Sequence, residues 1–177
     1  ITLTAANITA GSITRELTAP ANGSTLQVKA QLIDQANNAS SEGSDSAAID
    51  TSLPTGSISI DAITGDDFVS SGEAAGTVTI TGKVSGEFRA GDVVTLTLTD
   101  ASSANSTFTG TVNAQGVYSI SGVQGSKLAS DANTQISAKV AAHDAANNTA
   151  EYTATRSYTL DSNANADKTT LSLNPVS

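Results

Sequence analysis

The sequence predicts an all-β fold in which antiparallel sheets pack face to face, with such domains joined in tandem. Two observations carry this prediction. Apolar and polar residues alternate along a succession of short segments, and turn-forming residues separate these segments. In addition, one stretch of the chain repeats itself at an offset of 110 residues, which indicates tandem domains.

From residue 54 onward the alternation predicts seven strands, each with one apolar and one polar face. In the clearest of them, Val94, Leu96 and Leu98 alternate with threonines. Seven short antiparallel strands in about 100 residues are typical of an immunoglobulin-like (Ig-like) sandwich. The apolar residues that define the other six are Ile58, Ile60 and Ala62; Val78, Ile80 and Val84; Phe108 and Val112; Tyr118 and Ile120; Ile136, Ala138, Val140 and Ala142; and Tyr152, Ala154, Tyr158 and Leu160.

Residues 1–53 give a weaker pattern, with strands expected at 1–4, 12–17, 25–33 and 46–49. Four strands make about half a sandwich, which exposes an apolar face and open edges and is unstable by itself. Two interpretations remain open. Either the segment is a trimmed domain, or strands from another chain complete it.

The internal repeat sets the expected domain boundaries. Residues 26–40 match 136–150, and the apolar alternation of the two stretches coincides; 49–51 and 58–60 then match 160–162 and 171–173. We therefore expect the C-terminal part of one repeat at 1–53, a complete repeat at 54–163 and the start of a further repeat at 164–177. The identical pairs in the first window are Lys29 and Lys139, Asp34 and Asp144, Ala36 and Ala146, Asn37 and Asn147, and Asn38 and Asn148.

Composition excludes several classes of function. The chain has 177 residues, no Cys, and 17 acidic against 8 basic residues, for a net charge of −9. Without Cys there is no disulfide framework or zinc–thiolate site, and the negative field repels nucleic acid and anionic membranes. No apolar run approaches the length of a membrane span. The single histidine, His143, lacks a recognisable nucleophile partner and is expected at the surface, so we expect no enzyme.

Several segments between residues 54 and 163 resemble the Ig-like repeats of giant RTX-type, biofilm-associated bacterial adhesins. They occur in the order found in that family. Asn147 stands where the family has Gly, and Asn also tolerates the left-handed backbone that this position requires. The segments are Gly65-Asp66-Asp67-Phe68 with 72–82, Ala90-Gly91-Asp92 with 93–98, 108–112, 141–150 and Ser157-Tyr158-Thr159-Leu160-Asp161.

The resemblance implies a role and a location. Such proteins are exported by type I secretion to the cell surface, where tandem extender domains act in cell adhesion. Calcium ions bridge successive domains and stiffen the rod, so the implied partners are neighbouring repeats of the same polypeptide. The absence of disulfides is consistent with a bound metal as the stabilising element.

Three acidic clusters could bind Ca²⁺, which takes six to eight oxygen ligands. The first lies between the first two strands of the complete repeat, the second in the last hairpin of each repeat and the third at the linkers. Other interpretations are an Asx turn for the hairpin residues and solvated loop acids for the first cluster. The candidate ligands are Asp66, Asp67 and Glu73; Asp34 with Asn37, and Asp144 with Asn147; and Asp50 and Asp161.

Strand direction predicts which clusters meet. If successive strands run in opposite directions, Asp50 approaches Asp144 where the chain enters the complete repeat. Asp161 then approaches Asp66, Asp67 and Glu73 where the chain leaves it. An ion at either place would tie two domains together.

Three functions follow from these observations. The leading hypothesis is an extender segment of an extracellular adhesin. The incomplete repeat at residues 1–53 motivates the second, a surface filament that self-associates by strand complementation. The third is a ligand-binding Ig-like module that recognises a glycan or a protein through its loops; the aromatic content of 3% counts against it.

Overall fold

The computed structural model describes residues 1–161, and the chain divides into two compact units, Ile1–Ser52 and Leu53–Ser177. The start expected for a further repeat at 164–177 lies outside the described residues. Each unit is taken by itself below.

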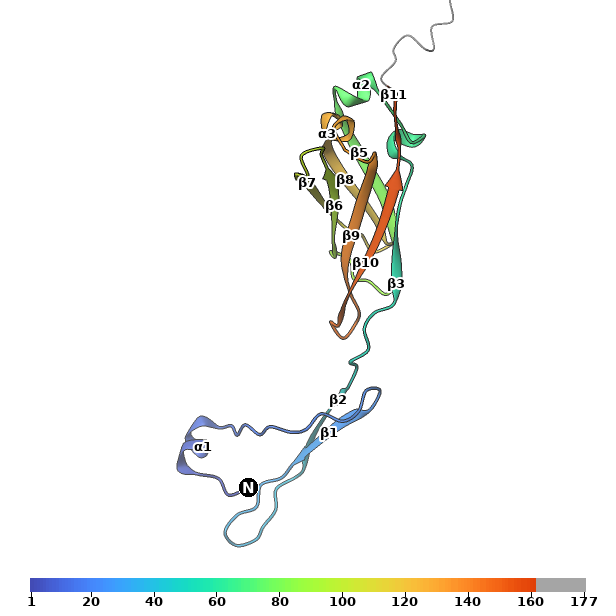
Figure 1. Cartoon of the computed structure of the whole chain (residues 1–177). Helices are drawn as coiled ribbons and strands as arrows, with labels where there is room; N and C mark the ends of the chain where they lie inside the picture. The colour runs from blue at the N-terminus through green and yellow to red at the C-terminus, as the bar shows by residue number, and fades with distance from the viewer. Residues whose placement is uncertain (162–177) are drawn as a thin grey trace, which may run out of the picture. The chain divides into compact units, whose positions relative to one another are not determined.

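The second unit is a sandwich of two antiparallel sheets, which Figure 1 shows facing each other. The three-stranded sheet has the order β3-β5-β8 and the four-stranded sheet the order β10-β9-β6-β7. This confirms the all-β Ig-like fold predicted from the alternation. The strands are β3 (Gly56–Ile60), β5 (Thr77–Gly86), β6 (Val93–Thr99), β7 (Asn105–Thr111), β8 (Val117–Gln124), β9 (Gln135–His143) and β10 (Thr149–Ser157).

The core lies between the sheets and consists of the alternate residues that the sequence placed on the apolar faces. In β5, Val78, Ile80 and Val84 are buried, and in β6 so are Val94 and Leu96. The threonines of these strands point outward. Burying such aliphatic side chains contributes about 1.5–3 kcal/mol each relative to exposure, so this core holds the sandwich together without disulfides.

Short elements close one end of the sandwich, at the top of Figure 1. They lie opposite the end that carries the β9–β10 turn. Tyr158 is buried beneath them, and its hydroxyl donates to the carbonyl of Leu128 (2.8 Å) and to Asp131 Oδ2 (3.0 Å). These elements are the 3₁₀ helix η1 (Ile63–Gly65), β4 (Phe68–Ser70), α2 (Ser71–Ala74), α3 (Gly125–Ala129) and β11 (Thr159–Asp161).

The structure corrects the predicted ends of two strands. The first predicted strand ends at Ile60, before Ala62. The last predicted strand, 152–160, divides at Tyr158 into β10 and β11. Because Tyr158 turns into the core, the chain leaves the four-stranded sheet there, and β11 pairs in parallel with β4.

The first unit contains α1 (Ala5–Ala10), β1 (Thr25–Ala30) and β2 (Gly43–Ala48). The strands expected at 1–4 and 12–17 are wrong. Thr4 and Asn7 form a capping box that starts α1, and Gly11 ends the helix with φ 65°. The strand expected at 25–33 ends at Ala30, and the one expected at 46–49 spans 43–48. No residue within 1–52 is buried.

Candidate metal centre

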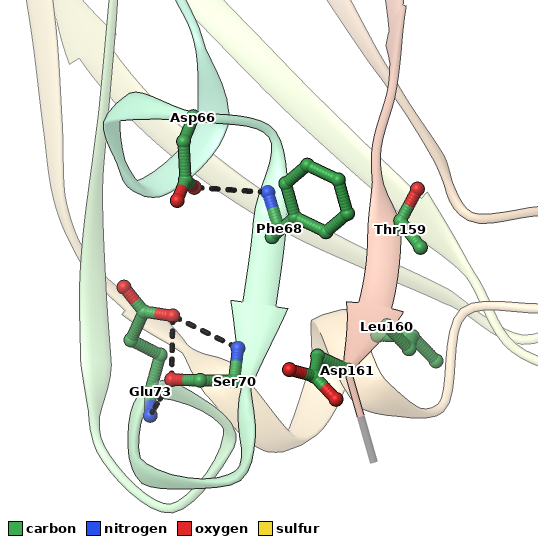
Figure 2. A pocket seen from close by; sticks show the side chains of 7 residues that line it. All are labelled: Asp66, Phe68, Ser70, Glu73, Thr159, Leu160 and Asp161. Atoms are coloured by element: carbon green, nitrogen blue, oxygen red, sulfur yellow. Dashed lines mark hydrogen bonds between the residues drawn. The ribbon is translucent and has the colours of Figure 1, made fainter. Parts of the chain in front are cut away.

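A hollow of about 680 Å³ lies where the chain leaves the sandwich, between β4, α2 and β11 (Figure 2). Three carboxylates line it: Glu73 from α2, Asp161 from β11, and Asp66 from the loop between η1 and β4. Phe68, 53% exposed, also lines the hollow. The lining residues are Asp66, Phe68, Ser70, Glu73, Thr159, Leu160 and Asp161.

Strand register brings these carboxylates to one place. The parallel pairing sets Asp161 opposite Ser70, and Figure 2 shows its side chain pointing from β11 toward Ser70. Glu73 belongs to α2, whose N-cap is Ser70, so the helix starts where β4 ends. Asp66 follows η1 and precedes β4. The tertiary fold thus gathers residues that are up to 95 positions apart in the sequence.

Local hydrogen bonds orient the carboxylates of Asp66 and Glu73. Asp66 Oδ1 accepts from the backbone N–H of Phe68 (3.0 Å) and from the hydroxyl of Thr64 (3.2 Å). Glu73 Oε2 accepts from the backbone N–H (2.9 Å) and the hydroxyl (2.7 Å) of Ser70. In both cases the bonds fall on a single carboxylate oxygen.

Asp67, which we expected in the same cluster, does not line the hollow. Its carboxylate forms an ion pair with Arg156 of β10, with Arg156 Nε 2.8 Å from Asp67 Oδ1, and accepts from the backbone N–H of Ile63 (2.9 Å). The hydrogen bond from Arg156 outweighs burial and lowers the pKa of Asp67. Asp67 therefore joins the η1–β4 loop to the four-stranded sheet.

The hairpin residues at the opposite end have partners within the protein. Asp144 accepts from the backbone N–H and the side-chain amide of Asn148 (2.8 and 2.9 Å). These bonds, the side-chain one foremost, lower the pKa of Asp144 despite partial desolvation. Asn147 adopts φ 71°, the left-handed backbone expected for this position, and its Oδ1 accepts from Arg89 Nη1 (3.1 Å). Arg89 Nη2 donates to the carbonyl of Asp144 (2.9 Å).

The equivalent residues of the first unit form the same kind of turn. Asp34 accepts from Ala36 and from the backbone and side chain of Asn38, at 2.8–2.9 Å. Its pKa is lowered, chiefly by the side-chain bond from Asn38. Asn37 adopts φ 65°. Asp50 Oδ1 accepts from the backbone N–H of Ser52 (3.0 Å). The approach of Asp50 to Asp144 concerns residues of different units and stays a prediction.

Two buried residues of the sandwich gave no signal in the sequence. Asp92 is 6% exposed and accepts from the backbone N–H groups of Arg89 and His143. Its Oδ1 lies 2.6 Å from His143 Nδ1, so the histidine is partnered and only partly exposed. Asp131 is buried and accepts from the backbone N–H of Thr99 (3.1 Å) and from Tyr158.

The donor set of the hollow fits a hard cation. Carboxylate and carbonyl oxygens are the ligands that Ca²⁺ prefers, and Asp66, Glu73 and Asp161 each supply a carboxylate to the hollow. Within residues 1–161, no group of three or more acidic or histidine side chains is arranged so that it could hold a metal ion. Binding at this hollow therefore requires the carboxylates to move together or to share the ion with further ligands.

Comparison with solved structures gives the family. A bacterial immunoglobulin-like domain from the M. primoryensis ice-binding adhesin is 39% identical, with a TM-score of 0.53. The match covers 62% of this chain and 100% of that domain. This chain belongs to the bacterial Ig-like domains of large adhesins. The resemblance inferred from the sequence is confirmed, and the Ig-like domains matched here are structural parts of adhesins, not enzymes.

Two longer structures agree with this assignment. One is from a 1.5-MDa bacterial ice-binding adhesin, in a study of its retention at the host cell surface (37% identity, TM-score 0.57). The other is from a Ca²⁺-stabilized adhesin that helps an Antarctic bacterium reach out and bind ice (35% identity, TM-score 0.57). Each match covers 78% of this chain, which spans 42% and 32% of those chains.

No protein-family model and no curated protein matches the chain. Within residues 1–161, the helices are too short or too polar to cross a membrane.

Proposed function

We propose that this Ig-like chain is an extender segment of a bacterial surface adhesin, stiffened by Ca²⁺ where the sandwich passes to the next repeat. The observation that carries the proposal is the hollow lined by Asp66, Glu73 and Asp161. It lies beside β11, the last strand before the chain continues beyond the described residues.

The three proposed ligands come from two parts of the domain. Asp161 belongs to the exit strand, whereas Asp66 and Glu73 belong to the body of the sandwich. When bound, Ca²⁺ would supply the positive charge that offsets the repulsion among these carboxylates. Asp161 would then hold the exit strand against β4 and α2, which restricts bending at the end of the domain. Repeats that are joined in this way would act as a rod.

The matched adhesins support the location and the role that we propose for this protein. The matched adhesin structures come from surface proteins, and one is described as Ca²⁺-stabilized. We accordingly propose an extracellular location at the bacterial surface, export by type I secretion, and a role in cell adhesion and biofilm formation. The remaining expected ligands, at Asp34, Asn37, Asp50, Asp144 and Asn147, stay secondary proposals because most of their donor atoms already bond within the protein.

Thermal unfolding in Ca²⁺ and in excess EGTA, with Mg²⁺ as a control, tests the proposal. An ion that binds only the folded state stabilises it by about 2.7 kcal/mol at 100 times its dissociation constant. We expect a Ca²⁺-specific rise in Tm that Asp161→Asn and Asp66→Asn each diminish. Asp100→Asn removes the same charge from a turn outside the hollow and should retain the rise. An equal Tm in Ca²⁺ and EGTA would remove the calcium part of the proposal.

A further inference from the structure

The first strand of the three-stranded sheet, β3, and the last strand of the four-stranded sheet, β10, lie side by side (Figure 1). The ring of Tyr152 in β10 packs against the backbone of Gly56 in β3, where an added Cβ would lie 2.9 Å from the ring. Four residues further along both strands, Arg156 Nη1 donates to the carbonyl of Ile60 (3.2 Å). Both contacts join residues 96 positions apart. The two strands therefore run in the same direction.

This arrangement determines how tension along the chain acts on the sandwich. The chain enters the sandwich at the start of β3 and leaves it after β10, through β11. Tension therefore pulls the start of β3 and the end of β10 in opposite directions. Because the two strands are parallel neighbours, this load slides one past the other and does not peel either of them away.

Backbone pairing resists the sliding unequally on the two sides. β10 pairs with β9 over nine positions, whereas β3 pairs with β5 over five. The hydrogen bonds of an antiparallel pair are perpendicular to the strands, so a load along a strand strains all of them together. The pairing of β3 is the shorter of the two, and we expect the sandwich to yield there first.

Arg156 connects the two strands at the end of β3. Besides its bond to the carbonyl of Ile60, its Nε lies 2.8 Å from Asp67 Oδ1, and its Nη2 pairs with Asp67 Oδ2. Asp67 is itself held in place, since its N–H donates to the carbonyl of Ile63 and its carbonyl accepts from the N–H of Thr159, both at 2.8 Å. A guanidinium presents its donors in a rigid fork, which suits it to hold several acceptors at once. Sliding of β3 past β10 must break these bonds.

We propose that Arg156 is a load-bearing cross-link between the first and last strands of the sandwich and delays unfolding when the chain is under tension. The inference rests on the extender role, which gives the tension its direction. It does not rest on Ca²⁺, because Arg156, Ile60 and Asp67 do not line the hollow where the chain leaves the sandwich.

The effect of the cross-link should appear under load more than at equilibrium. The side chains of Arg156 and Asp67 are 34% and 29% exposed, and ion pairs that water reaches contribute little to the free energy of unfolding. Forced unfolding depends instead on the rate at which the folded state is lost. A bond that lies directly across the sliding strands therefore affects the measured lifetime most.

Single-molecule pulling of the whole chain in EGTA tests the cross-link. The chain is held by its two ends at constant force, and the lifetime of the folded sandwich is measured. We expect Arg156→Gln to shorten this lifetime roughly tenfold or more. Arg156→Lys keeps the positive charge but loses the fork, and it should shorten the lifetime by less.

A second pulling direction distinguishes a cross-link from general stabilisation. Because the chain has no Cys, handles can be attached through Ser103→Cys and Ala114→Cys, in the turns that precede and follow β7. This load falls on β7, which Arg156 does not contact. We expect Arg156→Gln to change the lifetime there by about twofold or less.

Two outcomes would overturn the proposal. One is an unchanged lifetime of Arg156→Gln when the chain is pulled by its ends. The other is an equal shortening in both pulling directions, which would make Arg156 an ordinary stabilising residue. Because EGTA is present throughout, the melting experiment with Ca²⁺ judges the calcium proposal separately.

Discussion

At the scale of single residues, the aspartates of this chain differ according to what surrounds them. Asp66 and Asp161 line an open hollow, Asp67 forms an ion pair with Arg156, and Asp131 is buried beneath the closing elements. All are aspartates in turn-rich or strand-end sequence. Their roles follow from which N–H, hydroxyl or guanidinium groups the fold brings to them.

Asp131→Ala should destabilise the sandwich strongly. The substitution leaves the buried hydroxyl of Tyr158 and the N–H of Thr99 without this acceptor, and hydrogen bonds to a charged group are worth about 1.5–3 kcal/mol each. We expect a loss of about 3 kcal/mol in the free energy of unfolding, measured with urea. Asp100→Ala removes a partly buried aspartate whose hydrogen bonds come from its own turn, and it should cost less than Asp131→Ala. Equal losses in the two variants would show that burial of Asp131 is unimportant.

Asp92 should make stability depend on acidic pH. Burial alone would raise the pKa of Asp92, but the N–H groups of Arg89 and His143 and the His143 ring lower it more, so the folded pKa lies below 3.8. A lowered folded pKa contributes stability above the unfolded pKa, and this contribution is lost as pH falls through the folded value. Urea unfolding between pH 7 and pH 2 should show the free energy falling below about pH 4. The fall should be smaller in Asp92→Asn; an identical fall would contradict this role.

At the scale of elements, β4, α2 and β11 form a unit at the exit of the sandwich. The parallel pairing of β4 with β11 and the capping of α2 by Ser70 together place Glu73 and Asp161 on the same hollow (Figure 2). Neither the three-residue strands nor the four-residue helix would persist alone. They depend on the buried side chains of Val69 and Tyr158 beneath them.

The pairing of β3 with β5 depends on the absence of a side chain at Gly82. A Cβ there would lie 2.1 Å from the carbonyl oxygen of Ser59 and 2.3 Å from the hydroxyl of Tyr118. Because the clash involves backbone, Gly82→Ala should lower the free energy of unfolding by about 3 kcal/mol. Gly72→Ala, in α2, meets only ordinary contacts and should change it by less than about 1 kcal/mol. Thermal or urea unfolding compares the two variants, and a stable Gly82→Ala protein would refute the packing argument.

At the scale of the whole molecule, the two units differ in how much buried apolar surface stabilises them. The sandwich has a continuous apolar core, whereas none of residues 1–52 is buried. A two-stranded hairpin without a packed face is marginal in water. The hairpin of the first unit is therefore expected to be much less stable than the sandwich.

Hydrogen exchange should reveal this difference directly. We expect amides of β1 and β2 to exchange at nearly unprotected rates, because local opening costs little there. Amides of β6 and β9 should be protected by a factor on the order of 10⁴ or more, since they open only with the global core. Exchange monitored by NMR on the isolated chain measures both. Strong protection of residues 25–48 in the monomer would contradict the account of the first unit.

Much of the fold was predictable from the sequence because local pattern determines it. Alternation in segments such as 94–99 identified the seven sandwich strands and their buried faces, and the repeat of 26–40 at 136–150 identified two equivalent hairpins. A strand with one buried face requires that period, so the pattern survives in the sequence. The family could be recognised for the same reason.

Other features arose only in the tertiary structure. Sequence matching paired 49–51 with 160–162, whereas hydrogen bonding sets Ile49 in the place of Tyr158. The strands expected at 1–4 and 12–17 did not form, because a strand needs neighbours that the first unit lacks. Asp67 and Asp66 are adjacent in sequence, yet one meets Arg156 and the other the exit hollow. Alternation thus determined the strands of this protein, and only long-range register, which no local pattern encodes, decided which acidic side chains meet.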